Sequence, residues 1–171
     1  MRLPILATIA LCACSSIVPS TALRLSGLSP TTADPADFAI DLALPAGIDI
    51  QPGTAQLIFG VSRSDTGQEQ SGNFVLERAG SVFLVAASDV DRLRALQATA
   101  RQWGAENDAA TEGVLGVILS PCRIGDGPDP KARVSVGLRL AQDGAFLPLV
   151  RNGPLSAVAS EDEIRQMPLC P

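Results

Sequence analysis

The side chains that could do chemistry in this 171-residue sequence are carboxylates, arginines, hydroxyls, four cysteines and one lysine, because the chain contains no histidine and no tyrosine. Every mechanism that needs an imidazole is therefore excluded, including Ser-His-Asp hydrolysis, Cys-His proteolysis and the HExxH zinc site. A Ser-Lys dyad would require Lys131 with a hydroxyl such as Ser120 or Ser135, and no SxxK or GxSxG pattern surrounds them. No group in the sequence is obviously poised to abstract a proton.

Two groups of acidic residues remain as candidates for a site. Asp126 and Asp129 lie in the Gly/Pro-rich segment 125–130, and carboxylate oxygens are ligands that calcium prefers. Their spacing differs from that of the DxDxDG calcium loop, and the same residue types are common in tight turns, so we favour a plain turn. The acidic run 161–163 falls in the first turn of an expected helix, where acids complement the helix dipole.

Four arginines could form an anion site on one surface. Arg133 and Arg139 project from the same face of an expected strand, and Arg123 and Arg151 lie in nearby connections. The alternation of polar and apolar residues along that strand also explains the two strand arginines as part of a solvated face. We favour the solvated face.

The net charge excludes one class of partner. The chain has 13 basic against 18 acidic residues, a net charge of −5, and no cluster of Lys or Arg. Nucleic-acid binding relies on a basic surface, so we expect no nucleic-acid partner. The sequence also lacks a glycine-rich phosphate loop and a dinucleotide fingerprint, and we expect no cofactor.

The N-terminus has the pattern of a secretory leader. Arg2 supplies a positive charge, residues 3–11 are almost entirely apolar, and the run ends in Leu11-Cys12-Ala13-Cys14. These four residues resemble the lipobox of bacterial lipoproteins, with a small residue before the cleavage site and a cysteine after it. Cys12 fits less well, because Leu11 would then occupy the position of the small residue.

The resemblance implies lipidation of Cys14 and three regions in the chain. Residues 1–13 would be a signal peptide, residues 14–20 a lipidated anchor and tether, and residues 21–171 one globular domain on the periplasmic side. Ser15, in place of an aspartate after the lipidated cysteine, points to the outer membrane. The alternative is a signal peptide cleaved elsewhere, which would give a secreted periplasmic protein.

Two cysteines remain after processing, Cys122 and Cys170. Two thiols in an oxidising compartment can form only one intramolecular pair, and we expect a disulfide between them. A catalytic or metal-binding role is disfavoured, because neither cysteine belongs to a CxxC motif and no histidine is available.

Short apolar runs separated by turn residues predict mainly β structure. Strands are expected at 38–44, 54–62, 73–79, 82–86, 114–119, 133–140 and 145–150, with 48–50 as a possible extension of the first of these. Residues 21–28 have the pattern of a further short strand, and a linker is the alternative there. The polar segment 63–72 is expected to be an exposed loop between two antiparallel neighbours. The pair 133–140 and 145–150, joined by Asp143-Gly144, is the strongest hairpin signal.

Two helices are expected. Val90, Leu93, Leu96, Ala100 and Trp103 recur at helical spacing and predict a helix over 89–103, which begins with a capping box of Ser88 and Asp91 and ends near Gly104. At this spacing Trp103 is expected in the core, although it could also serve as a ligand platform. A second capping box, Ser160 with Glu163, predicts a short helix over 160–166 that stops before Pro168.

Together these patterns predict an antiparallel, sandwich-like mainly β or α+β domain with one amphipathic helix. The helix is expected to bury its stripe against Val134, Val136 or their neighbours. For function we expect a membrane-anchored envelope lipoprotein that is a non-catalytic binding or scaffolding module, with an envelope protein or a glycan as partner. The alternative is a hydrolase that cleaves glycans with carboxylates alone.

We predict that Cys14 carries the lipid anchor. Mass spectrometry of the native N-terminus should show a diacylglyceryl or triacylated cysteine, since several acyl chains hold a protein to a membrane firmly. Cys14→Ala should release the protein into the soluble fraction, whereas Cys12→Ala should not. A soluble wild-type protein that begins downstream of residue 14 would contradict this prediction.

Overall fold

The computed structural model describes residues 30–157 and 159–171. Everything expected for residues 1–29 lies outside this part of the chain: the signal peptide, the lipidation of Cys14, the tether and the short strand, 21–28. The described part is a mainly β domain with one main helix and one short C-terminal helix, as expected.

Seven strands form one antiparallel sheet. Its strands are β1 (Ala39–Ala43), β3 (Gln56–Arg63), β4 (Gln68–Ala79), β5 (Val82–Val85), β6 (Thr111–Ile118), β8 (Arg133–Arg139) and β9 (Leu147–Pro154). They lie in the order β6-β3-β4-β5-β1-β8-β9, so that β6 and β9 are the two edges. Two sequence-adjacent pairs, β3 with β4 and β8 with β9, are the hairpins that the sequence predicts.

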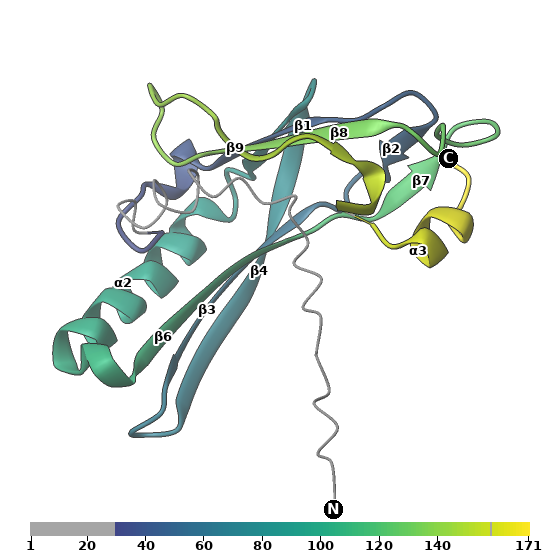
Figure 1. Ribbon diagram of the computed structural model, residues 1–171. Helices are drawn as coiled ribbons and strands as arrows, with labels where there is room; N and C mark the ends of the chain where they lie inside the picture. The colour runs from purple at the N-terminus through teal and green to yellow at the C-terminus, as the bar shows by residue number, and fades with distance from the viewer. Residues whose placement is uncertain (1–29, 158) are drawn as a thin grey trace, which may run out of the picture.

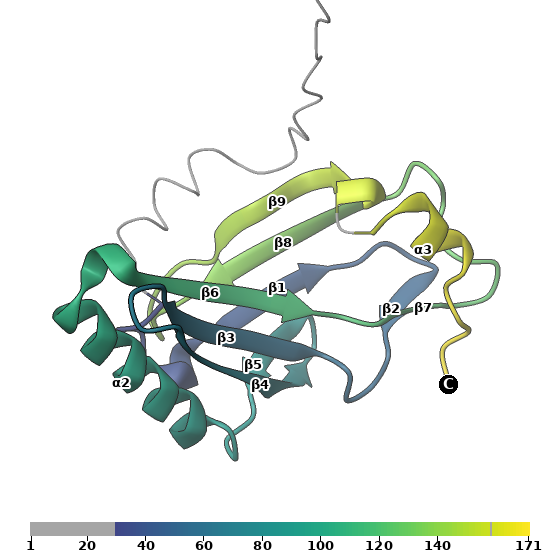
Figure 2. The ribbon, with the colours of Figure 1, turned by 90° about the horizontal axis from the view of Figure 1, so that it is seen from below.

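The sheet curls so that its two halves face each other. Figures 1 and 2 show β1, β8 and β9 as one layer and β3, β4 and β6 as the other, with β5 between β4 and β1 where the sheet turns over. Apolar side chains at alternate strand positions therefore point into a shared interior. Phe59 and Phe74 from one layer and Ile40 and Leu138 from the other belong to the same buried cluster.

A small second sheet extends from one end of the domain. Strand β2 (Ile48–Ile50) pairs with β7 (Pro121–Arg123), so residues 48–50 do not extend the edge of β1 as the sequence had allowed. The remaining elements are short helices: η1 (Pro35–Asp37), η2 (Asp108–Ala110), η3 (Leu155–Ala157) and α3 (Glu161–Arg165). Helix α3 begins with the expected capping box of Ser160 and Glu163.

Helix α2 (Val90–Glu106) covers one half of the interior. Leu93, Ala100 and Trp103 of its apolar stripe are buried as expected, whereas Val90 and Leu96 are half-buried against the same core. Among the strands the helix packs mainly against β3, β4 and β6, and Val134 of β8 belongs to the same buried cluster as Leu93 and Trp103. The partner of an amphipathic stripe is set by how the sheet curls, which the sequence pattern does not show.

The ends of α2 also differ from the expectation. Asp89 occupies the N-cap, and its side chain makes no capping bond to the helix, so the box of Ser88 and Asp91 does not form. One carboxylate oxygen of Asp89 instead accepts a hydrogen bond of 2.6 Å from the backbone amide of Val75 on β4. The helix continues past Gly104 to Glu106.

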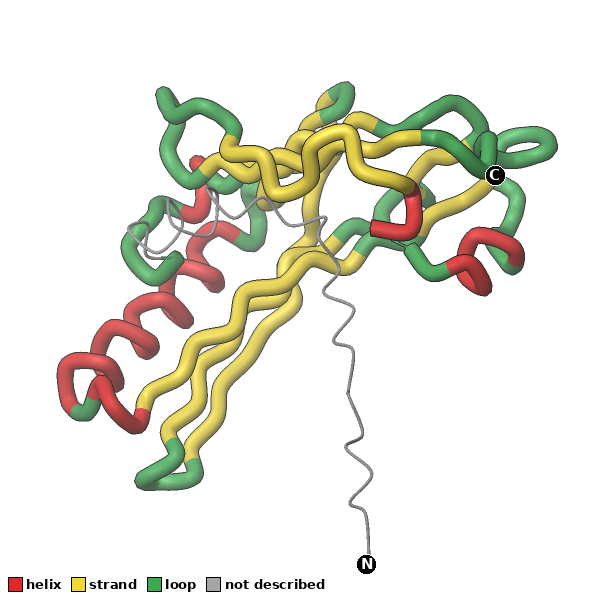
Figure 3. Tube along the Cα trace, in the orientation of Figure 1, coloured by secondary structure: helices red, strands yellow, loops and turns green. Residues whose placement is uncertain are grey.

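The expected loop 63–72 is mostly strand. Strand β3 runs to Arg63 and β4 begins at Gln68, which leaves a short turn at the tip of a long hairpin (Figure 3). The segment is largely solvent-exposed, as predicted. Residues without apolar side chains can still pair as strands when the hairpin that precedes them continues in register.

Arg63 ties this hairpin to the end of α2. Its guanidinium forms ion pairs with Asp65, at 2.8 Å, and with Glu106. Asp65 accepts two hydrogen bonds from Arg63 and a third from the side chain of Asn107. Hydrogen bonds from Arg63 and Asn107 lower the pKa of Asp65 to about 2.

We predict that this ion pair stabilises the fold at neutral pH and makes the free energy of unfolding depend on pH in the acid range. The pKa of Asp65 in the folded chain lies below the roughly 3.9 of an unfolded aspartate, so the stabilisation is present above about pH 4 and is lost as the pH falls toward about 2. Between these values the wild type should lose more stability than Asp65→Asn, as measured by urea unfolding. Asp91→Asn is the control, because the pair of Asp91 with Arg94 is exposed. The same pH dependence in wild type and Asp65→Asn would contradict the prediction.

Candidate binding cleft

An apolar cleft of about 690 Å³ lies between the two layers of the sheet. Its lining comes from β1, β8 and β9 in one layer, from β3 and β6 in the other, and from β2 and η3 at one end. Helix α2, which covers the other half of the interior, contributes no lining residue. The volume falls within the roughly 300–1,000 Å³ that is typical of ligand sites.

The wall formed by β1 and β8 follows from their register. Ile40 of β1 lies opposite Leu138 of β8, and Leu42 lies opposite Val136. Directly opposite residues of an antiparallel pair point to the same face, and all four side chains line the cleft. The alternation that predicted these two strands therefore produces one continuous apolar wall.

The facing wall is formed by β3 and β6. Leu57 of β3 pairs with Val117 of β6, and both line the cleft together with Leu115. Because β6 is an edge strand, its side chains are less covered than those of β3. Leu57 is buried, whereas Val117 is 42% exposed.

The lining is free of chemically reactive groups in the part of the chain that the structure describes. Its residues are aliphatic side chains together with Gly116 and Pro121, and none of them is ionisable or carries a hydroxyl. The polar atoms that a ligand could reach along β6 are main-chain N–H and C=O groups on its unpaired side, because β6 pairs with β3 alone among the described strands. An unsatisfied backbone group of this kind requires a hydrogen-bond partner when it is removed from water.

The acidic residues considered in the sequence do not belong to the cleft. Asp129 lies in the expected turn, where its carboxylate accepts a hydrogen bond of 2.7 Å from the backbone amide of Lys131. Hydrogen bonds from the hydroxyl and the backbone amide of Ser160 lower the pKa of Glu163. Among the described residues, no three cysteine or acidic side chains are grouped so that they could hold a metal ion.

The candidate arginines have separate surroundings. Arg139 stacks over the ring of Phe146, 5.1 Å from its centroid, and Arg123 donates to the carbonyl of Gly125. Arg123 and Arg151 lie within β7 and β9, not in connections as expected. These contacts fit side chains that stabilise their own surroundings.

The two edges of the sheet differ in how they are protected. Strand β9 contains Pro148, Pro154 and Arg151, and its pairing with β8 shifts register at two points. Prolines, charges and irregular pairing are features that prevent an edge strand from pairing with another chain. Strand β9 is therefore a protected edge.

Strand β6 has no proline and no irregular pairing, and it carries only one charge. Its sequence is Thr-Glu-Gly-Val-Leu-Gly-Val-Ile, with Glu112 as the single charge, and it pairs in register with β3 along its whole length. Val114 is 62% exposed and Ile118 is 43% exposed. An apolar edge of this length is able to accept another strand. The sequence analysis predicted this strand but could not show that it lies at an edge.

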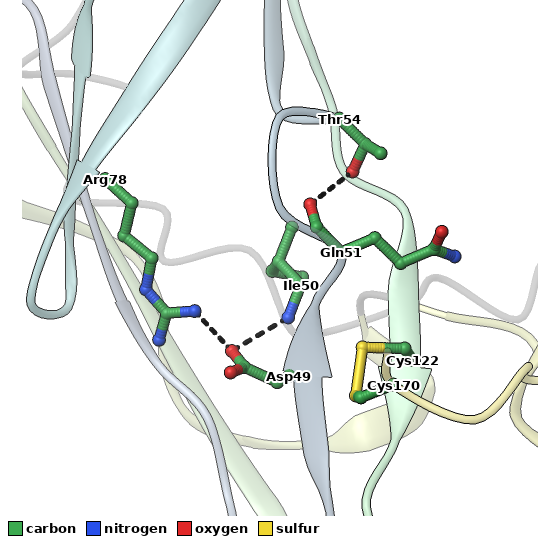
Figure 4. The surroundings of a disulfide bond; sticks show 7 residues. All are labelled: Asp49, Ile50, Gln51, Thr54, Arg78, Cys122 and Cys170. Carbon is green, nitrogen blue, oxygen red and sulfur yellow. Dashed lines mark hydrogen bonds and ion pairs between the residues drawn. A yellow bond between two sulfur atoms is a disulfide. The ribbon is translucent and has the colours of Figure 1, made fainter.

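A disulfide supports the end of the cleft. Cys122 and Cys170 are joined, with Cα atoms 4.9 Å apart, in agreement with the expected pairing. Figure 4 shows the disulfide bond beside β2. Asp49 of β2 forms an ion pair with Arg78. Cys122 directly follows Pro121, a lining residue on β7, so the bond fixes the C-terminal tail behind this end of the cleft.

Comparison with known proteins provides no relative: no family model, no curated protein and no solved structure matches this chain. None of the described helices is long and apolar enough to cross a membrane. The geometry of the cleft is therefore the basis for a functional proposal.

We predict that the disulfide contributes substantially to stability. The bond joins residues that are 48 positions apart in the sequence, for which the chain-entropy model gives about 4 kcal/mol. The double variant Cys122→Ala, Cys170→Ala should lower the free energy of unfolding by about this amount in urea titrations. Reduction of the wild type should produce a similar loss, and a loss much below 1 kcal/mol in both measurements would contradict the prediction.

Proposed function

We propose that the protein is a membrane-anchored binding module of the cell envelope, without catalytic activity of its own, and that the cleft is its binding site. The observation that carries the proposal is the apolar cleft beside the unprotected edge of β6. The absence of ionisable side chains among the described lining residues supports binding over hydrolysis by paired carboxylates. It also disfavours a glycan, whose hydroxyls would find no side-chain partner.

The edge of β6 favours an extended polypeptide as the ligand. A hydrocarbon chain could fill the apolar volume, but it would leave the main-chain groups along β6 without partners. An added strand satisfies those groups with backbone hydrogen bonds and places alternate side chains in the cleft. The expected partner is therefore an envelope protein that presents an extended segment with apolar residues at every second position.

The location follows from the lipobox resemblance. Lipidation at Cys14 would hold the domain at the periplasmic face of the outer membrane, and the alternative location is the periplasm without an anchor. In either location the partner is expected to be a protein of the envelope. A lipid anchor restricts diffusion to the membrane surface and raises the effective concentration of a partner there.

The proposal can be tested with defined probes. A fluorescein-labelled octapeptide with leucine at alternate positions and threonine between them should bind the full chain, with an affinity measurable by fluorescence anisotropy. The same peptide with N-methylated amides on one edge should bind at least tenfold more weakly, because it cannot pair with β6. The fluorescent fatty acid cis-parinaric acid serves as a hydrocarbon probe.

Two variants on the same strand provide a matched comparison. Val117→Lys places a charge in the cleft and should weaken peptide binding at least tenfold. Val114→Lys adds the same charge on the opposite face of β6, where it should change binding only a few-fold. Equal binding of the N-methylated and the unmodified peptide would contradict strand addition. Binding of the fatty acid without binding of the peptide would assign the cleft to hydrocarbon ligands instead.

A further inference from the structure

The two edges of the sheet restrict the direction of a strand that a ligand adds. Every neighbouring pair in the seven-stranded sheet is antiparallel, so the edge strands β6 and β9 run the same way. Figure 2 shows both arrows pointing toward the end of the domain that holds β2 and β7. A ligand strand in the cleft that is antiparallel to β6 is therefore antiparallel to β9 as well. This direction continues the alternation of the sheet, and antiparallel ladders are slightly more stable than parallel ones.

This direction places the two ends of the ligand in different surroundings. Strand β6 begins after α2 and η2 and ends shortly before β7. An antiparallel ligand therefore begins near β7 and ends beside the first residues of β6, Thr111 and Glu112. A parallel ligand would have its ends exchanged. A side chain that interacts with only one end of β6 can therefore distinguish the two directions.

The second half of β6 determines where the ligand needs apolar side chains. Leu115 and Val117 share one face of β6 and line the cleft, whereas Gly113 lies on the same face and does not line it. Ligand residues directly opposite Leu115 and Val117 point into the cleft. We therefore expect two apolar side chains that are two positions apart. The ligand residues beside the first half of β6 need no apolar side chain.

Glu112 provides a charge beside the first half of β6. It is the single charged residue of the strand, it is exposed, and it lies on the face away from the cleft. Across the paired side of β6 its neighbour is the neutral Ser62 of β3. None of the ion pairs among the described residues involves Glu112. A basic residue directly opposite it on an added strand is favourable, and an acidic residue is unfavourable.

Counting along an antiparallel ligand gives the spacing of these groups. The residue opposite Val117 comes first, the residue opposite Leu115 follows two positions later, and the residue opposite Glu112 follows three positions after that. The matching segment is therefore apolar-x-apolar-x-x-basic. A parallel ligand with the same two side chains in the cleft would place its basic residue beyond β6, beside the neutral Ser120.

We infer that the cleft binds extended segments with the pattern apolar-x-apolar-x-x-basic, antiparallel to β6, and that Glu112 selects this direction. This inference rests on the proposed function, because it specifies the ligand of the same site. The apolar side chains provide the burial, and the basic residue sets direction and register. A second copy of this chain fits less well, because its β6, with its own Leu115 and Val117 in the cleft, would place the neutral Ser120 opposite Glu112.

The test uses three octapeptides with acetylated and amidated ends. The matching peptide is Thr-Thr-Leu-Thr-Leu-Thr-Thr-Lys. The reversed peptide, Lys-Thr-Thr-Leu-Thr-Leu-Thr-Thr, has the same composition, but it can present its lysine to Glu112 only as a parallel strand. The third peptide has glutamate in place of the lysine of the first.

Calorimetric titration of the full chain should show that the matching peptide binds roughly threefold more tightly than either of the others. This is the magnitude expected of an exposed cross-strand charge pair. Tighter binding of the reversed peptide would show a parallel ligand and would overturn the inference.

Charge reversal on the protein supplies a matched control. Glu112→Lys should prefer the glutamate peptide over the matching peptide by a similar factor, because the cross-strand pair is restored with opposite signs. Asp126→Lys changes the net charge by the same amount in an exposed turn outside β6, and it should keep the wild-type preference. Equal affinities of the three peptides, in the wild type and in Glu112→Lys, would overturn the inference and leave the proposed function standing.

Two other outcomes concern the occupant of the cleft. If none of the three peptides binds to the monomeric protein, the proposed function fails and the inference fails with it. Analytical ultracentrifugation checks for a second copy at the same edge. A stable dimer that none of the peptides dissociates would identify a second copy of the chain as the occupant and would overturn the inference.

Discussion

Helix α2 fills only one half of the space inside the curled sheet, and the cleft is the other half. A sheet that is apolar on its inner face requires a covering layer along its whole width. Here the second layer is the same sheet folded over, with α2 between the two layers on one side. The other side has no element of the described chain between the layers, so the cleft follows from how this sheet is covered.

The elements that depend on local pattern could be predicted from the sequence. The hairpin of β8 and β9, the stripe of α2 and the cap at Ser160 require only neighbours within a few residues of each other. The box at Ser88 and Asp91 failed because Asp89 is bound to the backbone of β4, which is a tertiary contact. Local signals are reliable only where no long-range partner competes for the same group.

The candidate site could not be predicted, for a related reason. Leu57, Leu115 and Val136 were each expected in strands, but the cleft exists only because non-adjacent strands face each other. The difference between β6 and β9 is visible in their residues once both are known to be edges. A list of strands does not contain that information, since strand order depends on pairing between distant segments.

The central position of β1 has a consequence for how the chain reaches its fold. Strand β1 pairs with β5 on one side and with β8 on the other, and its partners in β8 follow it by about a hundred residues. While the chain emerges, β1 keeps an open edge and an apolar face until β8 arrives. Such an intermediate is prone to aggregate. The risk of aggregation is therefore greatest early, before β8 is available, and a fragment that lacks the last forty residues would retain that exposed edge permanently.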